Sequence, residues 1–362
     1  SRDATNDLLQ HEKTATILAT GGPGLVKAAY SSGNPALGVG PGNGPAYIER
    51  TANIPRSIYD IVLSKTFDNG MICASENSIV VDDEIYDEVK AELKKWNCYF
   101  IKPDEIDTFT KGFIDPKRHQ VAGPIAGRSA NDIADMCGLK NVPENTKVLI
   151  AEYEGVGNDY PLSAEKLSPV LTMYRVHSHK EAFDKCKELL HYGGEGHTAA
   201  IHTTDDSLAT QYGLEMRASR IIVNSPSALG GIGNIYNNMT PSLTLGTGSY
   251  GKNSVSHNVS DYDLLNYKVI AKRRENRQWV KIPPKVYFQR NSLKELQDIP
   301  NINRAFIVTG PGTVKRGYAQ RVIDQLRQRP LETHFQVFDE VEEDPSTDTV
   351  NKCVALMRDC KP

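Results

Sequence analysis

The sequence lacks the marks of a disulfide-stabilised, zinc-binding or membrane-spanning protein. Its six cysteines, in 362 residues, are unevenly spaced and form no Cys-x-x-Cys pair, which argues against a disulfide framework and a zinc site. No apolar run approaches the roughly 18 residues of a membrane-spanning helix. With 42 basic and 45 acidic residues the net charge is −3, which argues against a nucleic-acid binder. We therefore expect a reduced, cytoplasmic protein without nucleic-acid or membrane partners.

Residues 67–77 are the stretch around which the rest is organised, and Cys73 is at their centre. A helix is predicted before it, over 54–65, and a buried strand after it, over 78–82. A thiol at such a junction can face a cleft, where backbone N–H groups stabilise a thiolate and an oxyanion. The alternative is that Cys73 is a small buried hydrophobic residue. The local pattern leaves both interpretations open.

Two glycine-rich turns follow two predicted strands near the start of the chain. The first strand, 16–20, leads into Gly21, Gly22 and Gly24 and then a helix with a proline in its first turn. This arrangement can bring helix N–H groups to an anion such as a pyrophosphate, although a plain strand–helix connection also fits. A second strand, 35–39, runs into another glycine-rich turn. The pair favours part of a doubly wound nucleotide-binding sheet.

Helical and strand patterns alternate through the remainder, so the fold class is α/β. Further helices are predicted at 85–96, 129–138 and 180–190, and further strands at 148–151, 171–176 and 220–224, with one more strand after the glycine-rich stretch 193–198. The charge run 272–277 is interpreted as a solvated surface segment, and Pro283-Pro284 as a break. Residues 285–290 could pair as a strand. From residue 304 to residue 357 a second β-α-β-α pattern begins.

With these pieces in order, the chain resembles the bifunctional aldehyde–alcohol dehydrogenases of fermentative metabolism. The resemblance rests on the stretches 17–33, 64–76, 165–169, 241–246 and 269–276. It implies an aldehyde-dehydrogenase-like fold followed by the start of a second, Rossmann-like α/β domain. The implied divisions are a partial NAD-binding part (1–66), a catalytic part (67–245), a return segment and interdomain linker (246–300), and the start of an iron-type alcohol dehydrogenase domain (301–362).

The resemblance implies roles for individual residues. Cys73 would be the acylating nucleophile, which forms a thiohemiacetal with the aldehyde, loses hydride to NAD and becomes a thioester that coenzyme A accepts. Glu165 would bind the nicotinamide ribose, with a surface glutamate on a turn as the alternative. His197 would serve in proton transfer or CoA orientation, with a satisfied core histidine as the alternative. Gly21, Gly22 and Gly24 would shape the NAD site.

Val39 stands where hydrolytic aldehyde dehydrogenases carry a glutamate base. An apolar side chain cannot deprotonate water, so a thioester at Cys73 would persist until a thiol arrives. The resemblance therefore implies reversible conversion of acetyl-CoA to acetaldehyde, which the complete enzyme reduces to ethanol. No metal ligand is expected here, since iron belongs to the alcohol dehydrogenase half beyond this chain. The absence of an initiator methionine and the end at residue 362 suggest a segment of a longer polypeptide.

Two other interpretations stay open. A monofunctional CoA-acylating aldehyde dehydrogenase is one, but it has no reason to begin a second α/β sheet at residues 285–362. An inactive assembly unit is the other, since the family self-associates into dimers and helical filaments. Small-molecule substrates, acetyl-CoA and acetaldehyde, remain the expected partners in the first interpretation.

Overall fold

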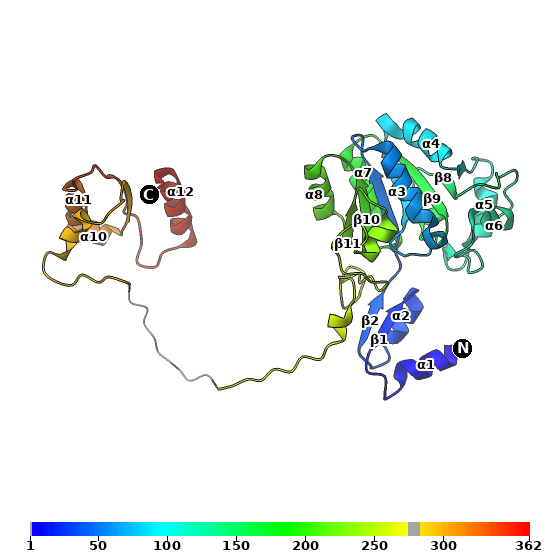
Figure 1. The fold of residues 1–362 in the computed structure, drawn as a ribbon, viewed down its shortest axis with the longest axis horizontal. Helices are drawn as coiled ribbons and strands as arrows, with labels where there is room; N and C mark the ends of the chain where they lie inside the picture. The colour runs from blue at the N-terminus through cyan, green and yellow to red at the C-terminus, as the bar shows by residue number, and fades with distance from the viewer. Residues whose placement is uncertain (1, 274–282) are drawn as a thin grey trace. The chain divides into compact units, whose positions relative to one another are not determined.

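The chain forms two compact units in its computed structural model, which describes residues 2–273 and 283–362. The units are Ser1–Lys268 and Val269–Pro362, and each is described by itself. Figure 1 shows the larger unit with its sheet and surrounding helices, and the smaller unit at the C-terminal end of the chain. No helix in the described part of the chain is long and apolar enough to cross a membrane.

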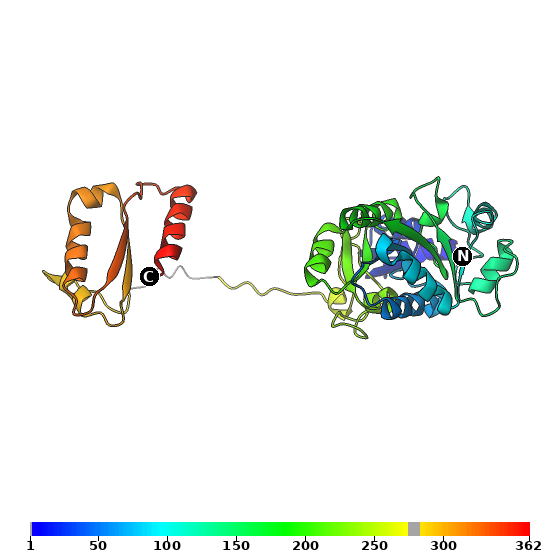
Figure 2. The ribbon, with the colours of Figure 1, turned by 90° about the horizontal axis from the view of Figure 1, so that it is seen from above.

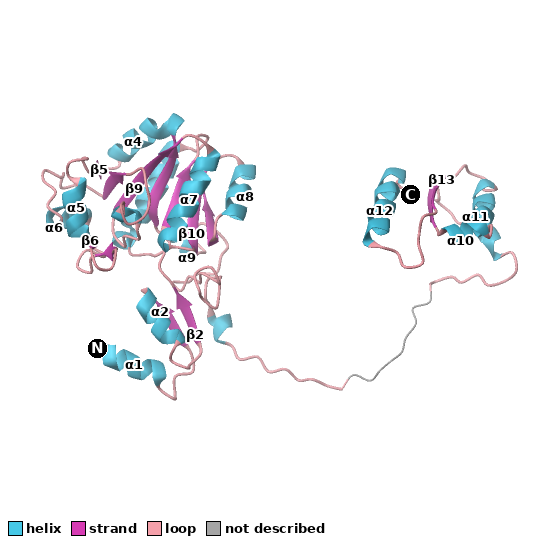
Figure 3. Ribbon diagram, turned by 180° about the vertical axis from the view of Figure 1, so that it is seen from behind, coloured by secondary structure: helices cyan, strands magenta, loops and turns pink. Residues whose placement is uncertain are grey.

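A seven-stranded parallel sheet is the centre of the larger unit (Figure 3). Its strands lie in the order β11-β10-β3-β4-β9-β8-β5. Every pairing whose register is defined in this sheet is parallel, which explains why helices cover both faces. The strands are β3 (Gly44–Ile48), β4 (Glu76–Asp82), β5 (Cys98–Phe100), β8 (Val148–Glu152), β9 (Val170–Val176), β10 (Gly196–His202) and β11 (Ala218–Val223).

Alternate residues of the central strands pack against different helices. Figure 2 shows the sheet and its helices from a second side. In β4, Ile79 and Val81 belong to the cluster with α3 (Ile54–Thr66) and α4 (Tyr86–Lys95), while Val80 belongs to the cluster with α7 (His179–Gly193) and α8 (Asp206–Glu215). The middle of the sheet is therefore buried on both sides, and β4, which follows Cys73, is held rigidly.

Smaller elements flank this sheet. A two-stranded parallel sheet, β1 (Ile17–Thr20) with β2 (Ala36–Val39), packs with α1 (Arg2–Gln10) and α2 (Pro23–Tyr30). A third cluster of buried residues lies around α5 (Ile106–Phe113) and α6 (Ala130–Met136), next to an antiparallel hairpin, β6 (Ile114–Asp115) with β7 (Gln120–Val121). The last helix of this unit is α9 (Ser227–Ile232).

The smaller unit begins a second α/β sheet. Its two strands, β12 (Arg304–Val308) and β13 (His334–Phe338), pair in parallel and are joined through α10 (Pro311–Lys315) and α11 (Tyr318–Arg327). Helix α12 (Thr347–Cys360) follows. A parallel pair needs such a crossover connection, so this is the β-α-β-α start that the sequence predicts.

Two sequence predictions differ from the structure. Residues 285–290 do not form a strand, because no neighbouring segment of the described chain offers them a ladder. Strand β3 was not predicted, since it begins within a glycine-rich run, and it joins residues 44–48 to the large sheet rather than to β1 and β2. The charge run 272–277 lies outside the described residues from position 274 onward. The divisions at 66, 245 and 300 stay predictions.

Candidate active site

Residues at the amino ends of four adjacent strands lie together at one end of the large sheet. The strands β10, β3, β4 and β9 are neighbours and parallel, so their amino ends lie side by side. Gly42 precedes β3, Cys73 precedes β4, Glu165 precedes β9, and His197 is the second residue of β10. The topology therefore brings together residues that are up to 155 positions apart in the chain (197 minus 42).

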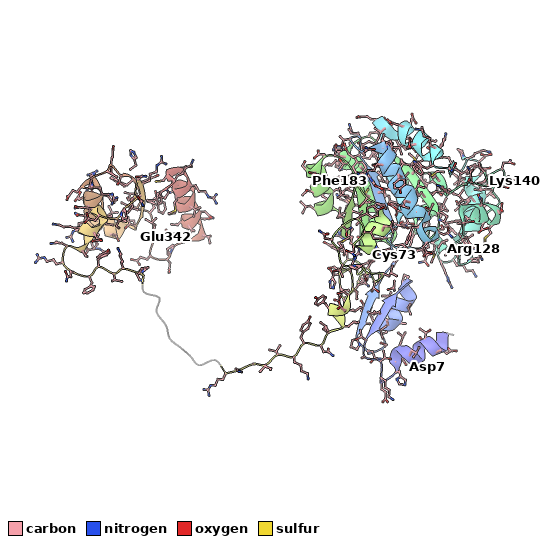
Figure 4. All side chains as sticks on the ribbon, in the orientation of Figure 1. Asp7, Cys73, Arg128, Lys140, Phe183 and Glu342 are labelled. Atoms are coloured by element: carbon pink, nitrogen blue, oxygen red, sulfur yellow. The ribbon has the colours of Figure 1, made fainter. Side chains whose placement is uncertain are left out.

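Cys73 lines a cavity of about 340 Å³ at this end of the sheet. The same cavity is lined by Gly21 and Gly22 from the turn before α2, by Val39 at the end of β2, and by Glu165. Figure 4 labels Cys73 at the end of the larger unit that carries β1, β2 and α2. This cavity is therefore lined by five of the residues that the sequence analysis singled out.

Glu165 lies where this cavity meets a second one of about 430 Å³. Gly22 and Glu165 line both, and the second cavity is also lined by Arg118 and His119 from the β6–β7 hairpin. The Glu165 carboxylate accepts a hydrogen bond from the Gly42 backbone N–H at 2.8 Å, which fixes one of its oxygens. The carboxylate is therefore oriented at the junction of the two cavities.

The resting Cys73 is a thiol. Burial, and after it the charge of Glu165, raises the pKa of Cys73 to about 12. The Arg220 guanidinium and the nearby backbone N–H groups act in the opposite direction. Because the thiolate is the nucleophilic form, loss of the Glu165 charge would favour a reactive Cys73.

His197 is fully buried behind Cys73 rather than on the cavity wall. Its Nδ1 lies 2.9 Å from the Thr198 hydroxyl, and its Nε2 has no hydrogen-bond partner among the described residues. Burial, and after it the charge of Arg220, lowers the pKa of His197 to about 3, so the imidazole is neutral. The sequence left a satisfied core histidine open as the alternative; the side chain is buried, but its Nε2 has no partner among the described residues.

Asn77 ties three cavity-lining segments together beneath the cysteine. Its side-chain amide donates to the Gly42 carbonyl at 3.0 Å, and its Oδ1 accepts from the Lys166 backbone N–H at 3.0 Å. Lys65 Nζ lies 3.5 Å from both Asn77 Oδ1 and the hydroxyl of Ser75, two residues after Cys73. A single buried amide therefore fixes the segments before β3, β4 and β9 against one another.

Two lysines and two glutamates share this buried region. Burial lowers the pKa of Lys65 to about 8 and that of Lys166 well below its ordinary value. Burial also raises the pKa of Glu76 and of Glu165 to about 7, against the opposing charges of the lysines. Glu165 can therefore change charge near neutral pH, and its charge acts on Cys73, which lines the same cavity.

Sequence reasoning missed Lys65, Asn77 and Arg220. A signal for Lys65 was present, since it extends the apolar period of Ile54, Ile58 and Ile61 and so falls on the buried face of α3. The structure places Gly24 within α2 and outside both cavities, whereas Gly21 and Gly22 line them. The role of Gly24 stays a prediction.

One group in the described residues has the spacing of metal ligands, and it lies at the opposite end of β3. Glu49, Asp82 and His179 come within 4.8 Å of one another. Asp82 already accepts hydrogen bonds from Tyr47 and Arg50, and Glu49 accepts them from two threonines. The carboxylates are neutralised and bonded within the protein, so we assign this group no ion.

Two family models match the chain. The aldehyde dehydrogenase family model matches residues 1–234, and the iron-containing alcohol dehydrogenase model matches residues 283–362. The aldehyde-alcohol dehydrogenase of Streptococcus pneumoniae is 47% identical over 370 residues, which is 100% of this chain and 42% of that protein. The chain therefore spans less than half the length of this curated relative.

Solved structures extend the comparison. An acetylating aldehyde dehydrogenase from Geobacillus thermoglucosidasius has 45% identity and a TM-score of 0.73, over 77% of this chain and 61% of that one. A propionaldehyde dehydrogenase from Rhodopseudomonas palustris, solved with bound CoA and an acylated cysteine, has 29% identity and a TM-score of 0.62, over 70% and 56%. The chain belongs to the aldehyde dehydrogenase family, and it carries the beginning of an iron-containing alcohol dehydrogenase domain as the bifunctional aldehyde-alcohol dehydrogenases do.

Proposed function

We propose that the chain contains the catalytic part of an NAD-dependent, CoA-acylating aldehyde dehydrogenase that interconverts acetyl-CoA and acetaldehyde. The observation that carries the proposal is the composition of the cavity around Cys73. A nucleophilic thiol and an oriented carboxylate, Glu165, share it with Val39, an apolar side chain where a water-activating base would otherwise stand. Such a cavity supports thioester formation and disfavours hydrolysis.

The residues present fit a nicotinamide dinucleotide. Gly22, the residue before α2, has nothing within 4 Å of where a side chain would begin, and no side chain caps its helix. Pro23 has no N–H, and Leu25 and Val26 donate to the Gly22 carbonyl, so the uncapped turn would approach a phosphate through the backbone of Gly22 and Gly24, and Glu165 would bind a ribose hydroxyl. NAD, when bound, supplies the hydride acceptor in the oxidative direction. Gly21 and Gly22 would hold it, and Glu165 would orient it.

The chain's own chemistry takes place at Cys73. The thiolate adds to the aldehyde carbon, a C–S bond forms, and the carbonyl electrons move to oxygen. Loss of hydride from the same carbon restores the carbonyl and leaves an acyl group on sulfur. The CoA thiolate then forms a new C–S bond at that carbon, and the bond to Cys73 breaks. In the direction of fermentation these steps run in reverse, from acetyl-CoA to acetaldehyde.

The second unit extends the proposal to a bifunctional enzyme. Residues 283–362 match the start of an iron-containing alcohol dehydrogenase, so the complete polypeptide would reduce acetaldehyde further to ethanol. Iron is expected only in the part of that half beyond this chain. A monofunctional acylating dehydrogenase does not account for β12 and β13. Self-association into dimers and filaments, and a cytoplasmic location, belong to the same proposal.

Replacing Cys73 tests the proposed function. In the complete polypeptide that carries this chain, Cys73→Ala should abolish NADH oxidation dependent on acetyl-CoA, while acetaldehyde reduction persists. The matched control is Cys353→Ala, in the second unit, which should retain acylating activity. If the Cys73 variant keeps more than a few per cent of the acylating activity, the chemistry belongs to another residue.

A further inference from the structure

Arg220 is a buried cation whose hydrogen-bond partners are all uncharged. Its side chain, 3% exposed, comes from β11 and makes hydrogen bonds to the backbone carbonyls of His197, Leu245 and Gly246. It also donates through Nη1 to Asn258 Oδ1 and through Nε to Thr198 Oγ1. Buried charges are ordinarily paired with an opposite charge, so an arginine held only by neutral groups needs an explanation.

The Thr198 hydroxyl connects Arg220 to His197. Arg220 Nε lies 3.2 Å from Thr198 Oγ1 and can only donate, so the hydroxyl oxygen accepts. The same oxygen lies 2.9 Å from His197 Nδ1. Among the described residues, Nδ1 is the only acceptor within reach of the hydroxyl proton. Thr198 therefore donates to Nδ1, and Nδ1 carries no proton of its own.

A neutral imidazole has one N–H, which this arrangement places on Nε2. His197 Nε2 is buried and has no partner in the described part of the chain. The adjacent carbon, Cδ2, faces the contact between Gly42 and Cys73. A side-chain carbon built on Gly42 would lie 3.2 Å from Cδ2 and 2.1 Å from the Cys73 carbonyl oxygen. The ring edge that carries Nε2 thus faces the segment that holds the nucleophile.

We propose that Thr198 and Arg220 are positioning residues that hold His197 as its Nε2–H tautomer, so that a neutral imidazole offers a hydrogen-bond donor beside Cys73. In this state His197 cannot act as a base through either nitrogen, because Nδ1 is bonded to Thr198 and Nε2 is already protonated. Because His197 does not line the cavity, this donor acts on the segment that holds Cys73 and not on the substrate itself. That role rests on the proposed function at Cys73, but the tautomer does not.

One neighbouring charge, that of Arg220, acts in the direction that this arrangement requires. The charge of Arg220 adds to burial in keeping the pKa of His197 low, and it lowers the pKa of the Cys73 thiol. Glu165 acts on Cys73 in the opposite sense. Arg220 thus favours an uncharged imidazole and an anionic sulfur at once, which is the combination that a donor and a nucleophile need.

Nitrogen NMR of the histidine-labelled chain tests the tautomer directly. The chain has nine histidines, and a His197→Asn variant assigns the signal. We expect the wild-type spectrum to show a neutral ring with its proton on Nε2. Thr198→Val should remove this preference, whereas Thr198→Ser, which keeps the hydroxyl, should restore it. The matched control is Thr172→Val on β9, where the hydroxyl lies 2.7 Å from Ser78 Oγ, and it should leave the His197 signal unchanged.

The proposal is overturned if wild-type His197 carries its proton on Nδ1 or is charged at neutral pH, and the wild-type spectrum alone decides this should Thr198→Val fail to fold. It is also overturned if a folded Thr198→Val chain keeps the wild-type signal. Acyl transfer is measured separately in the complete polypeptide. Loss of the proposed function would show as activity that survives Cys73→Ala, which leaves the spectrum unaffected, so the two failures are distinguishable.

Discussion

Gly42 donates its backbone N–H to the Glu165 carboxylate at 2.8 Å and, in the same residue, leaves no room for a side chain against Cys73. A side-chain carbon on Gly42 would lie 2.1 Å from the Cys73 carbonyl oxygen, far inside van der Waals contact. Gly42 therefore orients the Glu165 carboxylate through its N–H, and its lack of a side chain lets the segment that contains Cys73 approach the segment before β3. The close approach requires glycine, and the hydrogen bond requires the backbone to stay where it is.

Gly42→Ala should separate these segments. We expect a loss of about 1–3 kcal/mol in the free energy of unfolding, since the added methyl group meets backbone atoms that cannot yield cheaply. Acylating activity should fall by more than the loss of folded protein accounts for, because both Cys73 and Glu165 move. Urea unfolding measures the first effect, and NADH oxidation dependent on acetyl-CoA, in the complete polypeptide, measures the second.

The control for this change is Gly213→Ala, within α8. There the new carbon would meet only Ile221 side-chain atoms at 3.7 Å and 3.9 Å, ordinary contact distances. Alanine in a helix interior should leave activity unchanged and stabilise by up to about 1 kcal/mol. Equal behaviour of the two alanine variants would remove the steric argument for Gly42.

The apolar side chain of Val39 leads us to expect that a thioester at Cys73 persists when no thiol acceptor is present. Val39 is 1% exposed and lines the cavity with Cys73, so no carboxylate stands there to activate water. With aldehyde and NAD but without CoA, we expect at most one NADH per Cys73, measured as a burst in absorbance. Adding CoA should restore continuous turnover. Sustained acetate production without CoA would show that another base activates water, and the acylating assignment would fail.

His202 should contribute to acid destabilisation of the chain. The residue ends β10 with 1% of its surface exposed, and burial lowers its pKa from 6.5 to about 4. The unfolded chain therefore binds more protons below pH 6.5, and stability falls as the pH drops from there through about 4. The shift corresponds to about 3 kcal/mol over that range.

A neutral replacement isolates this contribution. His202→Gln should flatten the decline of unfolding free energy between pH 6.5 and 4, measured by urea denaturation at each pH. His197 contributes to the remaining slope, since its pKa is lowered to about 3. His11→Gln, at an exposed position, serves as the control. An unchanged slope in the His202 variant would mean that the imidazole is hydrated in the folded chain.

The sequence predicted the fold best where the pattern is unambiguous. Apolar helical periods located α3 and α7, and short apolar runs located β4, β9 and β11. Strand β3 was missed because glycines obscure its start, and residues 285–290 were given a strand that has no partner. A strand exists only through its pairing, and the pairing is long-range information that a local pattern does not contain.

At the site, the sequence motifs and the side-chain chemistry both single out Cys73 and Glu165, and in the structure both residues line the same cavity. Arg220 could not be found in this way. In the sequence, Arg220 is the first residue of an apolar run, a position that is typical of a solvated strand end. Only the register of β11 against β10, which pairs Arg220 with Thr198, shows that its side chain lies beneath the site.

The segment 283–290 carries the last prediction, which concerns assembly. Val286 and Phe288 are 54% and 87% exposed, although the segment forms no strand of its own. Tyr287 between them donates to Glu295 at 2.7 Å, which holds the segment in place while its two apolar neighbours stay in solvent. An extended segment with exposed apolar side chains can add to the sheet edge of another protomer. We expect this segment to dock on a second copy of the polypeptide.

Two aspartates should disrupt that contact. Val286→Asp with Phe288→Asp should reduce the particle size seen by light scattering, because a charged side chain cannot enter an apolar contact without a partner. Acylating activity per Cys73 should change less than the particle size does. The matched control, Gln289→Asp with Asn291→Asp, adds the same charge at two exposed polar positions, one in the segment and one directly after it, and should keep the wild-type size. If the first double variant also keeps that size, the segment takes no part in assembly.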